Sequence, residues 1–133
     1  MKKFLLLLLS TLPISSFASV VNISPADAAK LVAEGKAVLV DVREPSEWYE
    51  SGVAVPAVLL AKSDFDGDMA DSWKKFLAQN GDKEIILYCR SGKRAGVVGE
   101  ALEKSGHKVA NAGGFKDWQA AGLPVRKADG GKK

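Results

Sequence analysis

The fold is decided by one stretch of the chain, which runs from Glu84 to Gly96 and reads EIILYCRSGKRAG. Its first part, at 84–88, is short and largely apolar, a pattern typical of a strand buried on both faces. Cys89 follows at the carboxyl end of this strand, and a helix is predicted from about 94 to 105. Ligands of open α/β sheets bind at the carboxyl ends of the strands. The stretch therefore predicts an α/β domain with a reactive group at its binding edge.

Strands and helices alternate on both sides of this stretch. The run AVLVDV at 37–42 predicts a second buried strand, and 108–110 a third. Ser24, Pro25 and Asp27 form the capping pattern of a helix that opens the domain. Further helices are predicted at 46–49, 69–80 and 115–121. This alternation predicts one α/β domain with a mostly parallel central sheet covered by helices on both faces.

The amino terminus has the pattern of a cleavable signal peptide. Lys2 and Lys3 precede an apolar run at 4–12, and Ser16 and Ala18 occupy the small-residue positions of a cleavage site. An uncleaved membrane anchor is the alternative, but the run is shorter than the roughly 20 residues that span a bilayer. We therefore expect a periplasmic or otherwise exported protein that has no membrane attachment after cleavage.

Cleavage divides the chain and changes its charge. We expect a signal peptide at 1–18, the folded domain at 19–126 and a disordered tail at 127–133. Without the two lysines of the signal peptide, the 19 basic residues fall to 17 against 16 acidic ones. Nothing in the sequence resembles the clustered basic surface of a nucleic-acid-binding protein, so we expect no nucleic-acid partner. Cys89 is the only cysteine, so the domain forms no internal disulfide and is not a lipoprotein.

The residues after Cys89 form a short cationic loop. Arg90, Lys93 and Arg94 bring three positive charges, and Gly92 allows a tight turn. Backbone N–H groups in such a loop can converge on an anion, and the following helix adds positive charge at its amino end. These features favour the thiolate over the thiol and attract a small dianion. The alternative is a structural cysteine under a solvated basic turn, which the lack of any carboxylate within the segment disfavours.

An acidic stretch elsewhere invites a calcium-site interpretation. Asp64, Asp66 and Asp68 have the spacing that opens an EF-hand loop, but its twelfth position is Lys75 instead of a glutamate. A solvated acidic turn is the preferred interpretation. We expect neither a metal nor an organic cofactor.

Three motifs in order resemble the rhodanese family. They are DVREP at 41–45, YCRSGKRAG at 88–96 and AGGFKDW at 112–118, and AGLPV follows at 121–125. The resemblance extends over about 22–126, nearly the whole mature chain. It implies a rhodanese-like α/β domain that carries a sulfur atom as a persulfide on a cysteine.

The resemblance also implies roles for individual residues. Cys89 would take the outer sulfur of thiosulfate or a similar small anionic donor and pass it to a thiol or to cyanide. Asp41 and Arg43 would support the neighbouring loop, and a structural ion pair is the interpretation favoured for them. We expect a monomer. The residues implied to bind the donor and the persulfide are Arg90, Ser91, Gly92, Lys93, Arg94 and Ala95.

The sequence departs from the family pattern at one place, and other functions stay open. Many family members have a histidine where this chain reads GVAVPA at 52–57, so no histidine marks the site. A cysteine-loop phosphatase or arsenate reductase would need a loop one residue longer than the four residues between Cys89 and Arg94. A persulfide carrier without significant thiosulfate turnover would use the same loop. A binding module without catalysis is disfavoured because Cys89 is present.

Overall fold

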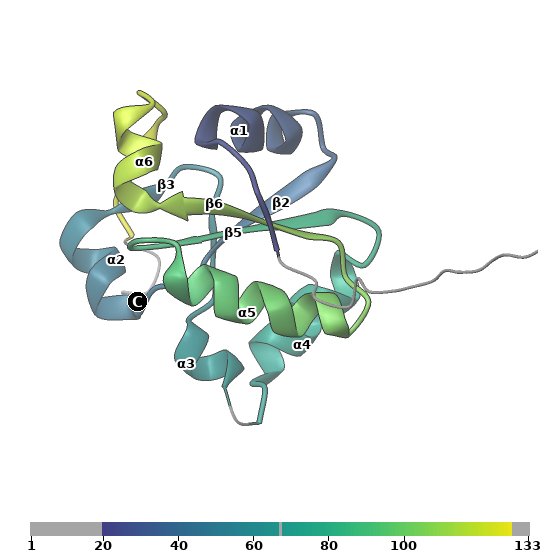
Figure 1. Cartoon of the computed structure of the whole chain (residues 1–133). Helices are drawn as coiled ribbons and strands as arrows, with labels where there is room; N and C mark the ends of the chain where they lie inside the picture. Colours follow the sequence, from purple (N-terminus) through teal and green to yellow (C-terminus); the bar gives the residue numbers. More distant parts are fainter. Residues whose placement is uncertain (1–19, 67, 129–133) are drawn as a thin grey trace, which may run out of the picture.

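The computed structural model describes residues 20–66 and 68–128 (Figure 1). The predicted signal peptide at 1–18 lies outside the described residues, as does most of the predicted tail, from 129 to 133. The described chain continues past the predicted domain end at 126 as far as Ala128, whose side chain is buried.

Five parallel strands form the central sheet, in the order β1-β6-β5-β2-β4. The strands β5 and β2 lie at its centre because both are apolar on their two faces. In β5, Ile85, Leu87 and Cys89 face one core, whereas Ile86 and Tyr88 face the other. The predicted mostly parallel sheet is confirmed. Its strands are β1 (Val21–Asn22), β2 (Ala37–Asp41), β4 (Val58–Leu59), β5 (Glu84–Cys89) and β6 (Val109–Gly114).

Helices cover both faces of this sheet, as predicted (Figure 1). One face packs on α1 (Pro25–Ala33) and α6 (Phe115–Ala120), and the other on α4 (Asp71–Gln79) and α5 (Lys93–Lys104). Two further helices, α2 (Pro45–Ser51) and α3 (Lys62–Phe65), follow the ends of β2 and β4. None of the helices in the described part of the chain is long and apolar enough to cross a bilayer.

A small second sheet joins two distant parts of the chain. It pairs β3 (Val53–Ala54) with β7 (Val125–Arg126) in antiparallel orientation. The hydroxyl of Tyr88 in β5 accepts a hydrogen bond from the Ala54 N–H at 2.9 Å. The second sheet is therefore attached to the centre of the first.

The strand β6 is longer than predicted. The sequence predicts a strand at 108–110, whereas the strand extends to Gly114. Residues 111–114 lack an apolar pattern, but β6 pairs with β5 on one side and with β1 on the other. Asn111 pairs with both neighbours, and Gly114 pairs with Cys89 of β5, so strand pairing extends β6 although the composition of this segment does not favour a strand.

Candidate active site

Cys89 lies at the carboxyl end of β5, and its sulfur is enclosed by the loop that follows. The backbone N–H of Gly92 lies 3.0 Å from the sulfur, and that of Ala95 lies 3.4 Å away. The residue is 0% exposed. Two N–H groups directed at one buried sulfur stabilise negative charge on it.

The turn at Gly92 makes this geometry possible. Gly92 precedes the first residue of α5 and has a φ of 99°, in the left-handed region. Because of this turn, its own N–H points back to the sulfur while α5 brings the N–H of Ala95 to the same atom. A side chain at this position would be strained and would also crowd the backbone of Gly113, 3.3 Å from the position of a Cβ atom.

The three cations of the loop are placed differently from one another. Arg90 and Lys93 are exposed, as is Ser91. Arg94 is partly buried and forms a two-pronged ion pair with Glu47 of α2, with distances of 2.7 and 2.9 Å. The loop itself contains no carboxylate. The charge of Arg94 is neutralised by Glu47, which is distant in the sequence.

The ion pair changes the titration of both partners. The hydrogen bonds from Arg94 lower the pKa of Glu47 to about 2, and those hydrogen bonds also raise the pKa of Arg94. The backbone N–H of Glu44 donates to the same Glu47 carboxylate at 3.0 Å. Glu47 lies 47 residues before its partner, and no motif marked it in the sequence.

Asp41 and Arg43 form a buried ion pair. The Arg43 guanidinium donates to both carboxylate oxygens of Asp41, at 2.8 to 3.1 Å, and also to the Ser51 hydroxyl and the Gly52 carbonyl. Burial alone would lower the pKa of Arg43, but the hydrogen bonds and the charge of Asp41 outweigh it and raise that pKa. The guanidinium also lies over the Phe115 ring, 4.4 Å from its centroid. The pair holds the end of β2 to the end of α2, and none of its hydrogen bonds within the described chain involves Cys89.

The end of β6 supports the loop from the other side. The Asn111 side chain donates to the Gly92 carbonyl at 2.9 Å and accepts from the Gly113 N–H at 2.8 Å. Gly114 lies so close to the Arg90 carbonyl that a Cβ atom there would collide with it. Asn111 was not predicted as a site residue from the sequence, although it directly precedes the AGGFKDW motif.

The described residues provide no metal centre. No three histidine, cysteine, aspartate or glutamate side chains of 20–66 and 68–128 converge to hold an ion. The site is therefore built from backbone N–H groups, a single sulfur and the charges around it.

The fold and the loop define an α/β domain with an enclosed cysteine at a strand end. The profile of the rhodanese-like domain matches residues 24–121. The chain is 30% identical over 113 residues to the thiosulfate sulfurtransferase GlpE of Actinobacillus succinogenes, covering 84% of this chain and 95% of that protein. It therefore belongs to the rhodanese-like family.

Two further similarities show how far the likeness extends. An uncharacterized protein from a Synechocystis strain is 31% identical over 115 residues, or 85% of this chain, and the chain spans 60% of its length. The crystal structure of a rhodanese-related protein from Thermoplasma volcanium superimposes with a TM-score of 0.65 at 25% identity, covering 80% of this chain and 97% of the other. The rhodanese-like fold class predicted from the sequence is confirmed.

Proposed function

We propose that the protein transfers a sulfane sulfur from thiosulfate or a similar donor to a thiol or cyanide acceptor, through a persulfide on Cys89. The observation that carries the proposal is the pair of N–H groups at 3.0 and 3.4 Å from the sulfur. The name of the relative GlpE, a thiosulfate sulfurtransferase, supports the choice of donor.

In the first step the Cys89 thiolate attacks the outer sulfur of the donor. A new S–S bond forms to Cys89 as the S–S bond of thiosulfate breaks, and the bonding electrons leave with sulfite. The negative charge then resides on the outer sulfur of the persulfide. Preorganised N–H groups stabilise such a charge without having to reorient during the reaction.

In the second step an acceptor takes the outer sulfur and returns Cys89 to its starting state. The transfer is covalent catalysis in two halves, and the protein alternates between a thiol and a persulfide form. Arg90 and Lys93 are the exposed cations of the loop and would attract the anionic donor. Arg94, which the sequence analysis also assigned to the donor, is instead assigned to holding the loop through Glu47.

The proposal includes export and a monomeric state. The signal-peptide pattern at 1–18 supports export. The intact mass of the protein recovered from the periplasmic fraction of a bacterial host reports the cleavage position. Cytoplasmic protein that retains residues 1–18 contradicts export, and size-exclusion chromatography with light scattering tests the monomer.

The same mass measurement tests the mechanism. Brief treatment with thiosulfate is expected to add one sulfur atom to the protein, whereas the Cys89→Ser variant gains none. Subsequent addition of cyanide or a thiol should remove the added sulfur. Slow removal by all small acceptors would favour a persulfide carrier. An adduct of equal yield on the Cys89→Ser variant, or no adduct from thiosulfate or any persulfide donor, contradicts the mechanism.

A further inference from the structure

The loop that encloses Cys89 turns at a glycine, and a glycine does not by itself hold one conformation. Gly92 has a φ of 99°, and its N–H lies 3.0 Å from the sulfur. Glycine adopts φ values of either sign with little preference, so its backbone can also turn the N–H away from the sulfur. Contacts between Gly92 and the rest of the fold are therefore needed to keep this N–H in place.

The carbonyl of Gly92 receives two such contacts. The Gly96 N–H donates to it at 3.0 Å within the first turn of α5, and Asn111 Nδ2 donates to it at 2.9 Å from β6. The first contact moves with the helix, whereas the second comes from the central sheet. Since Asn111 pairs with Leu87 of β5, its side chain fixes the turn relative to the strand that carries Cys89.

A second hydrogen bond determines the orientation of the Asn111 amide. Its Oδ1 accepts from the Gly113 N–H at 2.8 Å, which leaves Nδ2 to face the Gly92 carbonyl. Gly113 is also left-handed, with a φ of 85°, and its Cα lies 3.3 Å from the position of a Cβ atom at Gly92. One amide therefore connects two adjacent glycine turns, and reversing it would place oxygen against oxygen.

Both N–H groups at the sulfur depend on this connection. Gly92 supplies the first donor. Its carbonyl also begins the hydrogen bonding of α5, whose first turn brings the Ala95 N–H to 3.4 Å from the sulfur. A shift of this carbonyl would move both donors relative to Cys89, and the negative charge on the thiolate and on the persulfide would be less stabilised.

We propose that Asn111 is a positioning residue for sulfur loading, whose amide holds the turn at Gly92 so that both N–H groups face the Cys89 sulfur. Its side-chain hydrogen bonds within the described chain go to Gly92 and Gly113, so it acts on the sulfur through the loop. The inference rests on the proposed function, because loading is the first step of that function.

The Asn111→Asp variant separates hydrogen bonding from shape. The two side chains are nearly equal in size, and one carboxyl oxygen can still accept from the Gly113 N–H. The other oxygen faces the Gly92 carbonyl, to which it donates when protonated but which it repels when ionised. This contact favours the protonated form and raises the pKa of the introduced carboxyl above its ordinary value of about 3.9.

The charged and titratable groups around this position belong to three elements. Those of α5 are exposed and line a hollow of about 330 Å³ together with Asn111, the group of α6 accepts from the Gly114 N–H, and that of β5 is the thiol itself. The positive group favours ionisation of the introduced carboxyl and the negative groups oppose it, so the contact with the Gly92 carbonyl decides the direction. These groups are Lys93, Glu100, Asp117 and Cys89.

The rate of sulfur loading at several pH values tests the assignment. The wild type, Asn111→Asp and Asn111→Ala are mixed with thiosulfate between about pH 5 and 8, above the ordinary carboxyl titration, and the added sulfur is followed by mass. Each rate is divided by the wild-type rate at the same pH, which removes the pH dependence that the proteins share. We expect the ratio for Asn111→Asp to fall about tenfold as the pH rises, because a hydrogen bond is replaced by repulsion. The ratio for Asn111→Ala should be low and nearly constant, since alanine has no titrating group.

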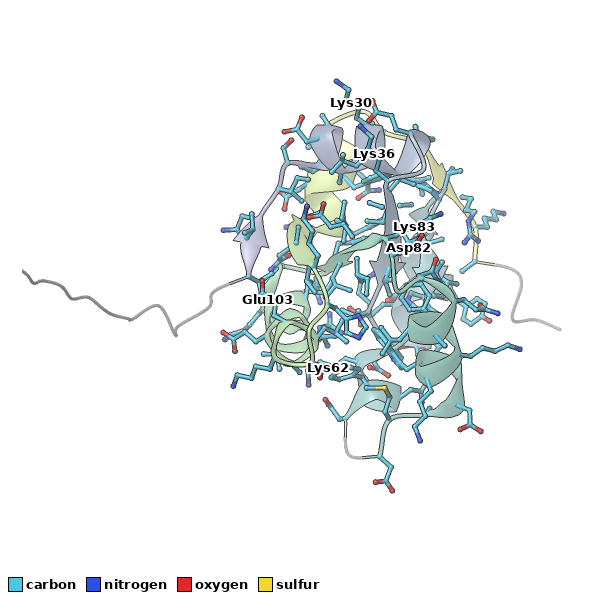
Figure 2. All side chains as sticks on the ribbon, turned by 90° about the vertical axis from the view of Figure 1, so that its right-hand side faces the viewer. Lys30, Lys36, Lys62, Asp82, Lys83 and Glu103 are labelled. Carbon is cyan, nitrogen blue, oxygen red and sulfur yellow. The ribbon has the colours of Figure 1, made fainter. Side chains whose placement is uncertain are left out.

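Asn80 provides a matched control far from the sulfur. Its Nδ2 also donates to a backbone carbonyl, that of Phe76, at 2.9 Å. Asn80 ends α4 and precedes Asp82 and Lys83, which lead into β5 at the end opposite Cys89 (Figure 2). The Asn80→Asp variant should load at the wild-type rate at every pH.

The outcomes separate this inference from the proposed function. A ratio for Asn111→Asp that does not change with pH, or that changes equally for Asn80→Asp, overturns the inference and leaves the proposed function in place. Failure of the wild type to load with any sulfur donor overturns the proposed function instead.

Hydrogen exchange tests the geometry without any sulfur transfer. The exchange rates of the Gly92 and Ala95 amides are measured by NMR in the unloaded proteins, each relative to the wild type at the same pH. In Asn111→Asp both amides should exchange about tenfold faster than in the wild type near neutral pH, with a smaller difference at about pH 5. Asn80→Asp should show no change at either amide. Wild-type exchange of both amides in Asn111→Asp near neutral pH contradicts the positioning role.

Discussion

At the scale of single residues, the ion pair between Glu47 and Arg94 shows that a cation of the loop can hold the loop in place instead of attracting an anionic ligand. Of the three cations after Cys89, Arg94 alone is held by a carboxylate from another element within the part of the chain that the structure describes. Since Arg94 precedes Ala95, holding its side chain against α2 also fixes the start of α5 beneath the sulfur. Glu47 is therefore a positioning residue and not a catalytic one.

The low pKa of Glu47 gives this pair a definite pH dependence. Its folded-state pKa of about 2 is below the ordinary 4.5, so the unfolded chain binds the proton more readily. The ion pair therefore stabilises the folded state fully above about pH 4.5, and this stabilisation is lost as the pH falls toward about 2. We expect Glu47→Gln to lower the free energy of unfolding by less than about 1 kcal/mol near neutral pH, because the ion pair is partly solvated. The difference in free energy of unfolding between this variant and the wild type should become smaller as the pH is lowered.

Urea unfolding at neutral pH and at about pH 3 measures this difference. Glu50→Gln is the matched control, since Glu50 lies on the same helix without an ionic partner in the described chain. A stability difference that is constant across the acidic range, or equal for the two variants, contradicts the role assigned to Glu47.

The sequence predicted a short cationic loop after Cys89 but not the groups that hold this loop. Cys89 and its cationic loop could be recognised because their determinants are adjacent in the chain. Glu47 and Asn111 act across 47 and 19 residues, through the packing of α2 and the pairing of β6. Neither contact leaves a local pattern, so only the folded structure brings them to the site.

At the scale of elements, the end of β6 sets the position of the loop. Gly114 has an ordinary φ of −111°, so its lack of a side chain serves the close approach to Arg90 and not backbone freedom. The Gly114→Ala variant must displace either the loop or β6. We expect a loss of about 1–3 kcal/mol in unfolding free energy, the usual effect of overpacking, together with slower persulfide formation.

Gly81→Ala provides the control for this variant. A Cβ atom there would meet only the Leu77 carbonyl at 3.8 Å, an ordinary contact. Unfolding and the rate of sulfur loading are measured for both variants. If Gly114→Ala loads as fast as Gly81→Ala, the end of β6 does not position the loop.

At the scale of the whole molecule, one buried ion pair connects three parts of the fold. The Arg43 side chain binds Asp41 at the end of β2. It also donates hydrogen bonds to Ser51 at the end of α2 and to the carbonyl of Gly52, which directly precedes β3 of the second sheet. The Arg43→Met variant retains much of the volume but leaves the Asp41 carboxylate buried without a partner. Such a loss costs about 3–5 kcal/mol, a large fraction of the 5–15 kcal/mol that stabilises a typical domain.

The denaturant midpoint of Arg43→Met, compared with that of Lys30→Met, tests this role. Lys30 is an exposed residue of α1, so its replacement should change stability by less than about 0.5 kcal/mol. Similar midpoints for both variants contradict a connecting role for Arg43. The overall architecture was predictable because the central strands are apolar and Ser24 caps the first helix, whereas this polar connection follows from tertiary contacts.

The complete burial of Cys89 also acts as a size filter. With none of its surface accessible, the sulfur meets a reagent only after neighbouring groups shift, and a small molecule requires a smaller shift than a folded protein. In an oxidising compartment this shields a lone thiol from mixed disulfides with bulky partners. A carrier role would demand wider loop opening than turnover of small molecules. The dependence of alkylation rate on reagent size therefore reports which of these two modes the fold permits.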